Sequence, residues 1–244
     1  MTDDVIREAS KEKIATYLYF LTIYAVTVGA LYLWGFWSTF NVNILEYMSL
    51  SDIIKSTIYP IGYASFFLGV GISIGLTGDS LPPGGGRDTR TGKFLNKSLP
   101  VILPLYAAGT VALIIFGPIT KWYVLPGLIG CPLCFIAGER GLFNQVIRHE
   151  KYRAIFSMMI ILLPIYAYGE GRMNADSIKT GKNYDYVEST TEGTNIAPNA
   201  IPAQRLRLLG HAGEFIFLLQ PSDEAIVMTK LEPSKALVLK HLSK

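Results

Sequence analysis

The sequence predicts an α-helical transmembrane bundle of about five spans with a small β-rich extramembrane module at its C-terminal end. Half of the 244 residues are apolar and only 17% are charged, and the mean hydropathy is +0.33. Soluble domains usually carry about 25% charged residues, so this composition is typical of a protein embedded in lipid. Long apolar runs fill residues 1–169, whereas residues 170–244 are rich in Gly, Asn, Asp, Lys and Thr. We therefore expect a transmembrane helical domain followed by a small β-rich extramembrane domain, with the boundary near residue 169.

The first predicted span is residues 14–37, a run of 24 residues without a charge. At about 1.5 Å per residue this run exceeds the ~30 Å hydrocarbon core of a bilayer. A cleavable signal peptide would have a shorter apolar region and a small-residue cleavage site, whereas this run ends in Trp34, Phe36 and Trp37. Aromatic residues in that position are typical of the membrane–water interface.

The second predicted span is residues 53–76. Ser49 and Asp52 precede it with the spacing of a capping box, in which each residue satisfies a backbone donor near the other. This pair predicts where the helix begins. The following residues 77–99 contain three consecutive glycines and four cations, a composition typical of a flexible cytoplasmic loop.

Three further apolar runs, residues 99–117, 122–138 and 154–169, complete the predicted bundle, and the last two are near the short limit for a span. Lys and Arg accumulate in residues 77–99 and 139–153, as they do in cytoplasmic loops. This pattern predicts a multi-pass protein of the bacterial inner (plasma) membrane with a cytoplasmic N-terminus and a periplasmic C-terminal module. If residues 154–169 lay along the membrane surface, four spans would leave that module in the cytoplasm.

Short apolar runs separated by turn residues indicate an antiparallel meander in the C-terminal module. The expected strands are residues 205–209, 214–219 and 225–229, with further candidates at 184–187 and 236–241. Because so few strands bury only a small core, we expect the module to lean on the membrane part or on a second copy.

The predicted spans carry no ionisable side chain at their centres. A charge there would cost at least ~2.5 kcal/mol and would mark a functional site. His149, His211 and His241 lie in different segments without the spacing of metal ligands. The sequence therefore predicts no catalytic residue, no metal site and no cofactor.

Cys131 and Cys134 form a candidate redox pair, because two thiols three residues apart can close a disulfide or share a soft metal ion. In a membrane bundle the pair resembles the Cys-x-x-Cys of disulfide-generating quinone oxidoreductases, which are small helical membrane proteins. Those enzymes relay electrons through a second cysteine pair, and this chain has two cysteines in all. Thiol redox chemistry is thus an alternative function, and the competing interpretation is two small apolar residues beside a kink proline.

The stretch from Phe40 to Asp52 resembles a motif of small multi-spanning bacterial membrane proteins that have a β-rich C-terminal tail and no assigned activity. In those proteins a late span is followed by a Gly-x-x-x-Ala segment like Gly171 to Ala175 and by a tail like Leu208 to Thr229. The resemblance supports the predicted architecture and transfers no catalytic residue. Its candidate recognition residues are Asn43, Tyr47, Ser49 and Asp52.

Apolar, glycine-rich spans without buried charges favour recognition between helices within the membrane. The sequence therefore predicts a non-enzymatic integral inner-membrane interaction protein, which confers immunity against a membrane-active toxin or senses membrane injury in bacterial defence. The similarity to pore-toxin immunity proteins lies in general design only. Expected partners are the lipid bilayer, a membrane protein or toxin, and further copies of the chain in a homo-oligomer, but no nucleic acid.

The alternative is a small channel or transport subunit that becomes a pore as a homo-oligomer. Hydroxyl side chains of the first two predicted spans could line such a pore: Thr16, Thr22, Thr27, Ser65 and Ser73.

Overall fold

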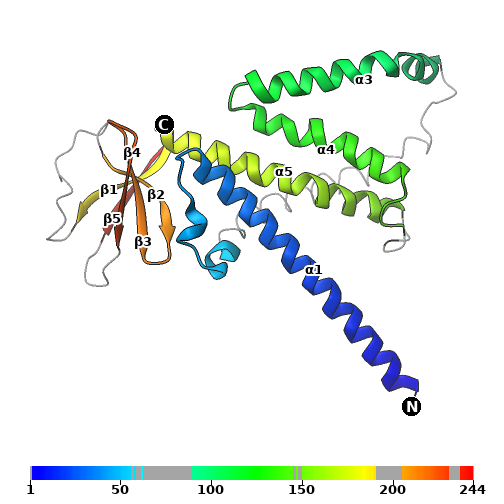
Figure 1. Ribbon diagram of the computed structural model, residues 1–244, viewed down its shortest axis with the longest axis horizontal. Coiled ribbons are helices and arrows are strands. Elements are labelled where there is room, and N and C mark those ends of the chain that lie inside the picture. Colours follow the sequence, from blue (N-terminus) through cyan, green and yellow to red (C-terminus); the bar gives the residue numbers. More distant parts are fainter. Residues whose placement is uncertain are drawn as a thin grey trace. The chain divides into compact units, whose positions relative to one another are not determined.

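The computed structural model combines long helices with one sheet (Figure 1). It describes residues 2–55, 58, 62, 90–144, 147, 150–190, 205–230 and 237–243. The helices are α1 (Thr2–Ser38), the short 3-10 helix η1 (Ile44–Glu46), α3 (Arg90–Phe116), α4 (Lys121–Glu139) and α5 (Glu150–Thr180). The strands are β1 (Asn183–Thr190), β2 (Arg207–Ala212), β3 (Phe215–Gln220), β4 (Ala225–Lys230) and β5 (Leu237–Ser243).

The predicted five-span bundle is wrong, because the described residues contain one long apolar helix and a five-stranded antiparallel sheet. Among them, α1 alone has a stretch long and apolar enough to cross a membrane, the 24 residues Ala15–Ser38. The third predicted span is a shorter apolar stretch of α3, Pro100–Phe116, and the fourth corresponds to α4. Most of the second predicted span, residues 53–76, lies outside the described residues.

The fifth predicted span, residues 154–169, is one part of the 31-residue helix α5. At 1.5 Å per residue such a run covers about 24 Å, which is less than the ~30 Å hydrocarbon core. The helix continues through Glu170, Arg172 and Asp176, whose charges end the apolar run without ending the helix. This run is therefore a segment of a longer helix rather than a complete span.

The C-terminal end of α1 is fixed by a backbone reversal. Asn41 adopts a left-handed conformation with a φ of 56°, and its amide N–H donates to the Ser38 carbonyl at 3.4 Å. The Ser38 hydroxyl donates to the Gly35 carbonyl at 3.1 Å, which satisfies one of the acceptors left open at a helix end. The chain then passes through η1 to a helical stretch at residues 50–55.

The five strands pair antiparallel in the order β4-β3-β2-β1-β5. In the β2–β3 hairpin Ala212 lies opposite Phe215, and Gly213 in the turn has a φ of 55°. Two-residue hairpin turns need such a positive φ, which glycine adopts without a steric cost. β5 returns to the edge beside β1 and completes the sheet.

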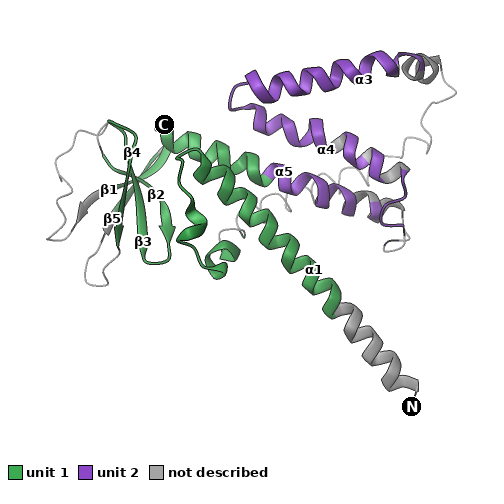
Figure 2. Ribbon diagram, in the orientation of Figure 1, with its two compact units in different colours: residues 1–60, 167–244 green, residues 61–166 purple. Residues whose placement is uncertain are grey.

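The chain divides into two compact units, residues 1–60 with 167–244 and residues 61–166 (Figure 2). In the first unit the sheet packs against the last turns of α1 and against η1, so residues far away in sequence complete its small core. The ring centroids of Trp37 and Phe217 lie 5.1 Å apart in an edge-to-face arrangement. The core consists of Leu33, Phe36, Trp37, Ile44, Ala175, Leu209, Ala212, Phe217 and Leu219.

Two glycines allow α1 and the second half of α5 to cross in close contact. A Cβ added at Gly35 would lie 2.3 Å from the Tyr168 carbonyl oxygen, and one at Gly171 would lie 2.2 Å from the Tyr32 carbonyl oxygen. No larger residue fits at either position unless one backbone moves. The Asn174 amide also donates to the Tyr32 hydroxyl at 3.3 Å across this crossing.

The second unit consists of α3, α4 and residues 150–166 of α5. The Tyr106 hydroxyl of α3 donates to the Leu128 carbonyl of α4, and a Cβ at Gly130 would meet the Leu162 side chain of α5 at 2.1 Å. Large apolar side chains of α3 and α4 nevertheless remain exposed: Val101, Leu103, Leu105, Phe116 and Tyr123. Exposed apolar surface of this extent is typical of contact with lipid or with a partner.

Candidate interaction surface

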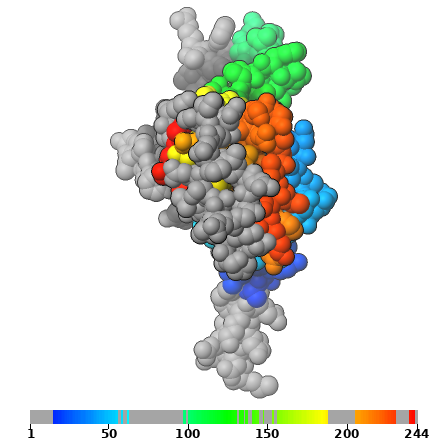
Figure 3. All heavy atoms as spheres, turned by 90° about the vertical axis from the view of Figure 1, so that its left-hand side faces the viewer, coloured from blue at the N-terminus to red at the C-terminus, as the bar shows by residue number. Residues whose placement is uncertain are grey.

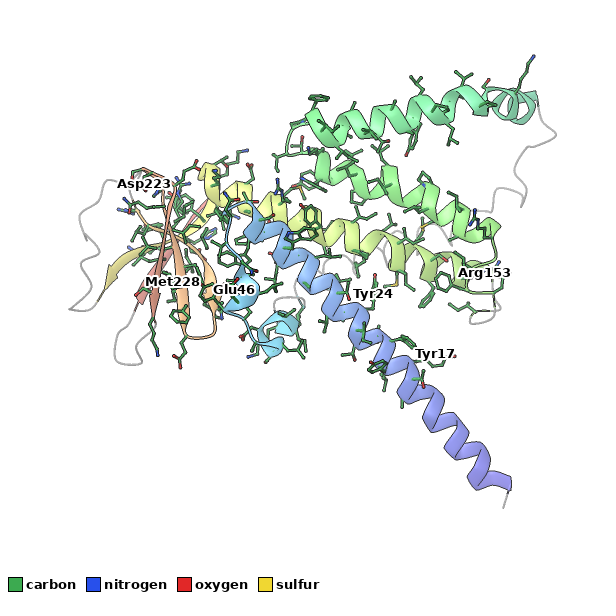
Figure 4. The ribbon with its side chains drawn as sticks, in the orientation of Figure 1. Tyr17, Tyr24, Glu46, Arg153, Asp223 and Met228 are labelled. Atoms are coloured by element: carbon green, nitrogen blue, oxygen red, sulfur yellow. The ribbon has the colours of Figure 1, made fainter. Side chains whose placement is uncertain are left out.

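Residues 41–55, which follow α1, contain all four predicted recognition residues and form what we term the recognition segment. In the space-filling view the light-blue residues of this segment lie beside the orange strands of the sheet (Figure 3). The Asn43 side-chain amide donates to Glu46 Oε1 at 2.6 Å across η1. Glu46 is exposed (Figure 4), so this bond orders a carboxylate at the surface of the segment.

Ser49 and Asp52 form the predicted capping box. The Ser49 hydroxyl and backbone N–H donate to Asp52 Oδ2 at 2.8 Å and 3.1 Å, and the Asp52 backbone N–H donates to Ser49 Oγ at 3.3 Å. These reciprocal bonds satisfy donors that the first turn of a helix leaves open. The prediction that a helix begins here is confirmed.

Tyr47 packs the recognition segment against strand β3 of the sheet. Its ring lies edge-to-face against Phe215 at 6.0 Å and against Phe217 at 5.4 Å between centroids. Edge-to-face aromatic pairs stabilise a contact by about 0.5–1.5 kcal/mol beyond the burial of area. Tyr47 therefore positions the segment, while Asn43 and Ser49 lie exposed on it.

Asp52 is held in its ionised form. The hydrogen bonds from the Ser49 hydroxyl and backbone keep the pKa of the Asp52 carboxyl below its ordinary value, and the nearby Lys55 ammonium acts in the same direction. Hydrogen bonds to a carboxylate favour the charged form. The segment therefore presents the Asp52 carboxylate beside the acidic side chain of Glu46.

An apolar stripe adjoins these carboxylates. Leu50 and Ile54 are exposed and lie one turn apart on the helical stretch 50–55, and Ile58, four residues further along the chain, is exposed as well. Ile53 instead packs against the core of the unit. The recognition segment thus offers exposed apolar side chains next to negative charge, a combination suited to a partner that is apolar and basic.

Residues 15–23, at the beginning of the apolar stretch of α1, are all exposed. Five consecutive residues from Tyr17 to Leu21 are between 57% and 65% exposed, and 22% of the most apolar window of the helix is buried. Figure 4 labels Tyr17 and Tyr24 along this part of α1. A helix that is apolar all round needs either a protein core or lipid around it.

Two of the hydroxyl groups proposed to line a pore form hydrogen bonds within α1 itself. The Thr22 hydroxyl donates to the Leu18 carbonyl and the Thr27 hydroxyl donates to the Ile23 carbonyl, both at 2.8 Å. Such bonds satisfy a hydroxyl on an apolar helix without a pore. Ser65 and Ser73 lie outside the described residues, so the channel stays a prediction.

The backbones of Cys131 and Cys134 lie one helical turn apart in α4. Cys134 is half-buried and is present as a thiol, whereas the side chain of Cys131 is outside the described part of the chain. The redox pair stays a prediction. Within the described ranges, no group of three or more His, Cys, Asp or Glu side chains could hold a metal ion.

Sequence reasoning missed a polar pair on β1 and β5. His241 Nδ1 lies 2.8 Å from Asp185 Oδ1, and the two residues are direct partners in the register of the strands. They border a cavity of about 250 Å³ together with Asn174, Ser177 and Asn183. Only the pairing of β1 with β5 brings this His and this Asp together, and no local signal in the sequence predicts that pairing. Because both side chains are about half exposed, we regard the pair as a surface contact that stabilises little.

Comparison with known proteins identifies no relative. No protein-family model, curated protein or solved structure matches this chain. The resemblance to small multi-spanning bacterial membrane proteins therefore stays a prediction. Function has to be inferred from the residues and contacts described above.

Proposed function

We propose that this chain is a non-enzymatic membrane interaction protein, anchored by α1 and contacting its partner through the recognition segment. The observation that carries the proposal is the exposed apolar surface of α1 from Tyr17 to Leu21. Transfer of one large apolar side chain out of water is favourable by about 1.5–3 kcal/mol. Leu18, Phe20 and Leu21 are each about 60% exposed, so their transfer into lipid would contribute about 3–5 kcal/mol, a gain unavailable to this part of the helix in water.

The sheet and the recognition segment belong at the end of α1 that leaves the bilayer. Trp37 in the last turn of α1 packs on Phe217 of β3, so the sheet lies on the side of the membrane where Ser38 lies. The N-terminal tail carries Arg7, Lys11 and Lys13, and Lys and Arg favour the cytoplasmic side. On this basis the N-terminus is cytoplasmic and the sheet is periplasmic in a bacterial inner membrane.

The chemistry of the recognition segment favours a cationic amphipathic helix as the partner. The exposed acidic side chain of Glu46 and the half-buried Asp52 carboxylate match basic side chains, and the stripe of Leu50, Ile54 and Ile58 matches an apolar helix face. Membrane-active peptides combine a Lys/Arg-rich face with an apolar face. Binding such a helix at the periplasmic surface would keep it from the bilayer, which supports a role in immunity against a membrane-active toxin.

Membrane attachment is tested on the full chain by extraction of cell membranes with alkaline carbonate. We expect the chain to stay in the membrane pellet and to be released by detergent. A chain that appears in the soluble fraction, or that remains monodisperse in buffer without detergent, would contradict the proposal.

Partner binding is tested with a synthetic Lys/Leu amphipathic helix added to the protein in nanodiscs. Removal of both charges by Glu46→Gln and Asp52→Asn should weaken binding about three- to tenfold, since each exposed ion pair contributes up to ~1 kcal/mol. The matched control removes two exposed acids of the β3–β4 turn by Asp223→Asn and Glu224→Gln. Equal affinity of the two double variants would rule out the recognition segment as the binding surface.

A further inference from the structure

Arg172 of α5 is a cation with one described hydrogen-bond partner in the protein around it. Its Nη1 donates to Ser38 Oγ at 3.2 Å, and its Nε is buried without an acceptor in the described part of the chain. A guanidinium has five N–H donors, so most of its hydrogen-bonding capacity is unused by the described residues. A buried donor left without a partner usually costs about 1–3 kcal/mol. The Arg172 side chain as a whole is half-buried, so its remaining Nη groups are the ones that can meet an acceptor supplied from outside the protein.

Other arginines of the same unit have partners within it. Arg207 Nη1 donates to the carbonyls of Ile178 and Lys179 at 2.6 Å and 2.8 Å, and its guanidinium lies 4.7 Å from the centre of the Tyr184 ring. The Arg205 guanidinium lies 4.6 Å from the centre of the Tyr186 ring. Arg172 differs because its one described partner is a hydroxyl.

The position of Arg172 is fixed by the packing around it. Its neighbour Gly171 touches the Tyr32 backbone, and Gly35 touches the Tyr168 backbone, so the two helices cannot slide without a clash. Ser38 in turn donates to the Gly35 carbonyl and so presents its oxygen lone pair to Arg172. Glu170 lies two residues before Arg172 on α5, and residues two apart on a helix point in different directions.

Arg172 lies at the level where α1 leaves the apolar part of a bilayer. The candidate span ends at Ser38, the residue that Arg172 contacts. One turn earlier, the exposed ring of Trp34 lies edge-to-face against Tyr168 at 5.6 Å. Trp and Tyr prefer the membrane–water interface, where lipid phosphates lie.

We propose that Arg172, oriented by Ser38, binds the phosphate of an anionic lipid headgroup at the periplasmic end of α1. A guanidinium presents parallel N–H groups that match a phosphate in a two-point contact, and such charge-assisted bonds are stronger than neutral ones. The site rests on the proposed membrane anchoring and adds a lipid preference to it. Bound lipid would hold the α1–α5 crossing, and with it the sheet, at a fixed height above the bilayer.

The test measures lipid bound to the full chain. Protein stripped of lipid in detergent is titrated with phosphatidylglycerol or phosphatidylcholine, and retained lipid is counted by native mass spectrometry. Wild type should bind phosphatidylglycerol about tenfold more tightly than Arg172→Gln, which corresponds to loss of one charge-assisted contact. The affinity of Arg172→Lys should lie between those of wild type and Arg172→Gln, because the lysine ammonium keeps the positive charge but lacks the parallel N–H groups of a guanidinium. Arg205→Gln is the matched control and should bind as wild type does.

Each outcome decides the proposal. Equal retention of phosphatidylglycerol by wild type and Arg172→Gln would overturn the site. Displacement of phosphatidylglycerol by inorganic phosphate at equal concentration would also overturn it, because the site would then bind free anions. If circular dichroism shows that Arg172→Gln unfolds, Ser38→Ala is tested in its place. Ser38→Ala should weaken lipid binding about threefold. Unchanged lipid binding by Ser38→Ala would also overturn the site. A wild-type chain that does not enter membranes in the carbonate test refutes the anchoring itself, whereas a membrane-bound chain with no role for Arg172 refutes this site alone.

Discussion

The two ends of the apolar stretch of α1 are both uncharged and apolar but have different surroundings. From Tyr17 to Leu21 the side chains are exposed, whereas Leu33 and Trp37 in the last turns are 3% exposed. Both regions are apolar and without charge. The last turns are covered by the sheet and η1. Hydropathy alone therefore does not distinguish an exposed apolar surface from one that is packed against protein.

The two regions differ in how closely they are fitted to their neighbours. Near its end α1 has a glycine, Gly35, that admits the backbone of Tyr168, and an indole, Trp37, that meets the ring of Phe217. Protein cores are packed as densely as organic crystals, so a change of one side chain is felt. Lipid chains adapt to any apolar surface. Substitutions should accordingly be costly in the last turns and cheap in the exposed region.

The largest effect is expected from Phe217→Ala. The Phe217 ring is 2% exposed and contacts both Trp37 and Tyr47, so its removal leaves a cavity. We expect the free energy of unfolding to fall by about 3–5 kcal/mol, as is usual for a buried Phe. The free energy of unfolding is measured by urea denaturation in mild detergent, with tryptophan fluorescence as the signal.

The matched control is Phe20→Ala, the same truncation in the exposed region of α1. Its free energy of unfolding should stay within about 0.5 kcal/mol of wild type. Similar losses in both variants would mean that Phe20 is packed against protein, and the distinction between the two regions would be lost.

The next largest effect is expected from Gly171→Ala. The added Cβ would lie 2.2 Å from the Tyr32 carbonyl oxygen, so the α1–α5 crossing would have to open. Overpacking of this kind costs about 1–3 kcal/mol in unfolding free energy. Gly109→Ala is the control, because nothing lies within 4 Å of its Cβ and Ala favours a helix interior by about 1 kcal/mol. A stabilised Gly171→Ala variant would show that the crossing is loose.

Local features could be predicted from the sequence because local chemistry determines them. The strands β3 and β4 lie within one residue of the runs 214–219 and 225–229, and β2 lies within three residues of the run 205–209. In these runs apolar residues are separated by turn residues. The Ser49–Asp52 capping box was predictable for the same reason, since its two partners are three residues apart.

Features that join distant parts of the chain could not be predicted. The order of the strands places β5 beside β1 and so brings His241 to Asp185, 56 residues away. The contact between Arg172 and Ser38 spans 134 residues. Run length was equally uninformative about where α5 ends, because charged side chains interrupt an apolar run without interrupting a helix. Such contacts depend on the fold as a whole.

A smaller effect is expected from Ser49→Ala, which removes the hydroxyl of the capping box. Loss of an N-terminal capping side chain usually lowers the free energy of unfolding by about 1 kcal/mol. Ser51→Ala, two residues later on the same helical stretch, leaves the cap intact and should change stability by no more than a few tenths of a kcal/mol. Equal effects of both substitutions would show that the cap contributes nothing to the recognition segment.

The smallest effect is the dependence of this cap on pH. The pKa of Asp52 is lowered in the folded chain from the ordinary value of 3.8, chiefly by the Ser49 hydroxyl. A lowered pKa means that the folded state favours the carboxylate, so the stabilisation is complete above the unfolded pKa and is lost as the pH falls through the folded pKa. Asp52→Asn has no charge to lose, so the difference in unfolding free energy between wild type and this variant should shrink as the pH falls below about 4. Glu214, whose pKa is lowered by its bond and charge contact with Lys230, titrates in both proteins and cancels in that difference. A difference that stays constant down to pH 2 would mean that Asp52 is held by something other than its ionised contact with Ser49.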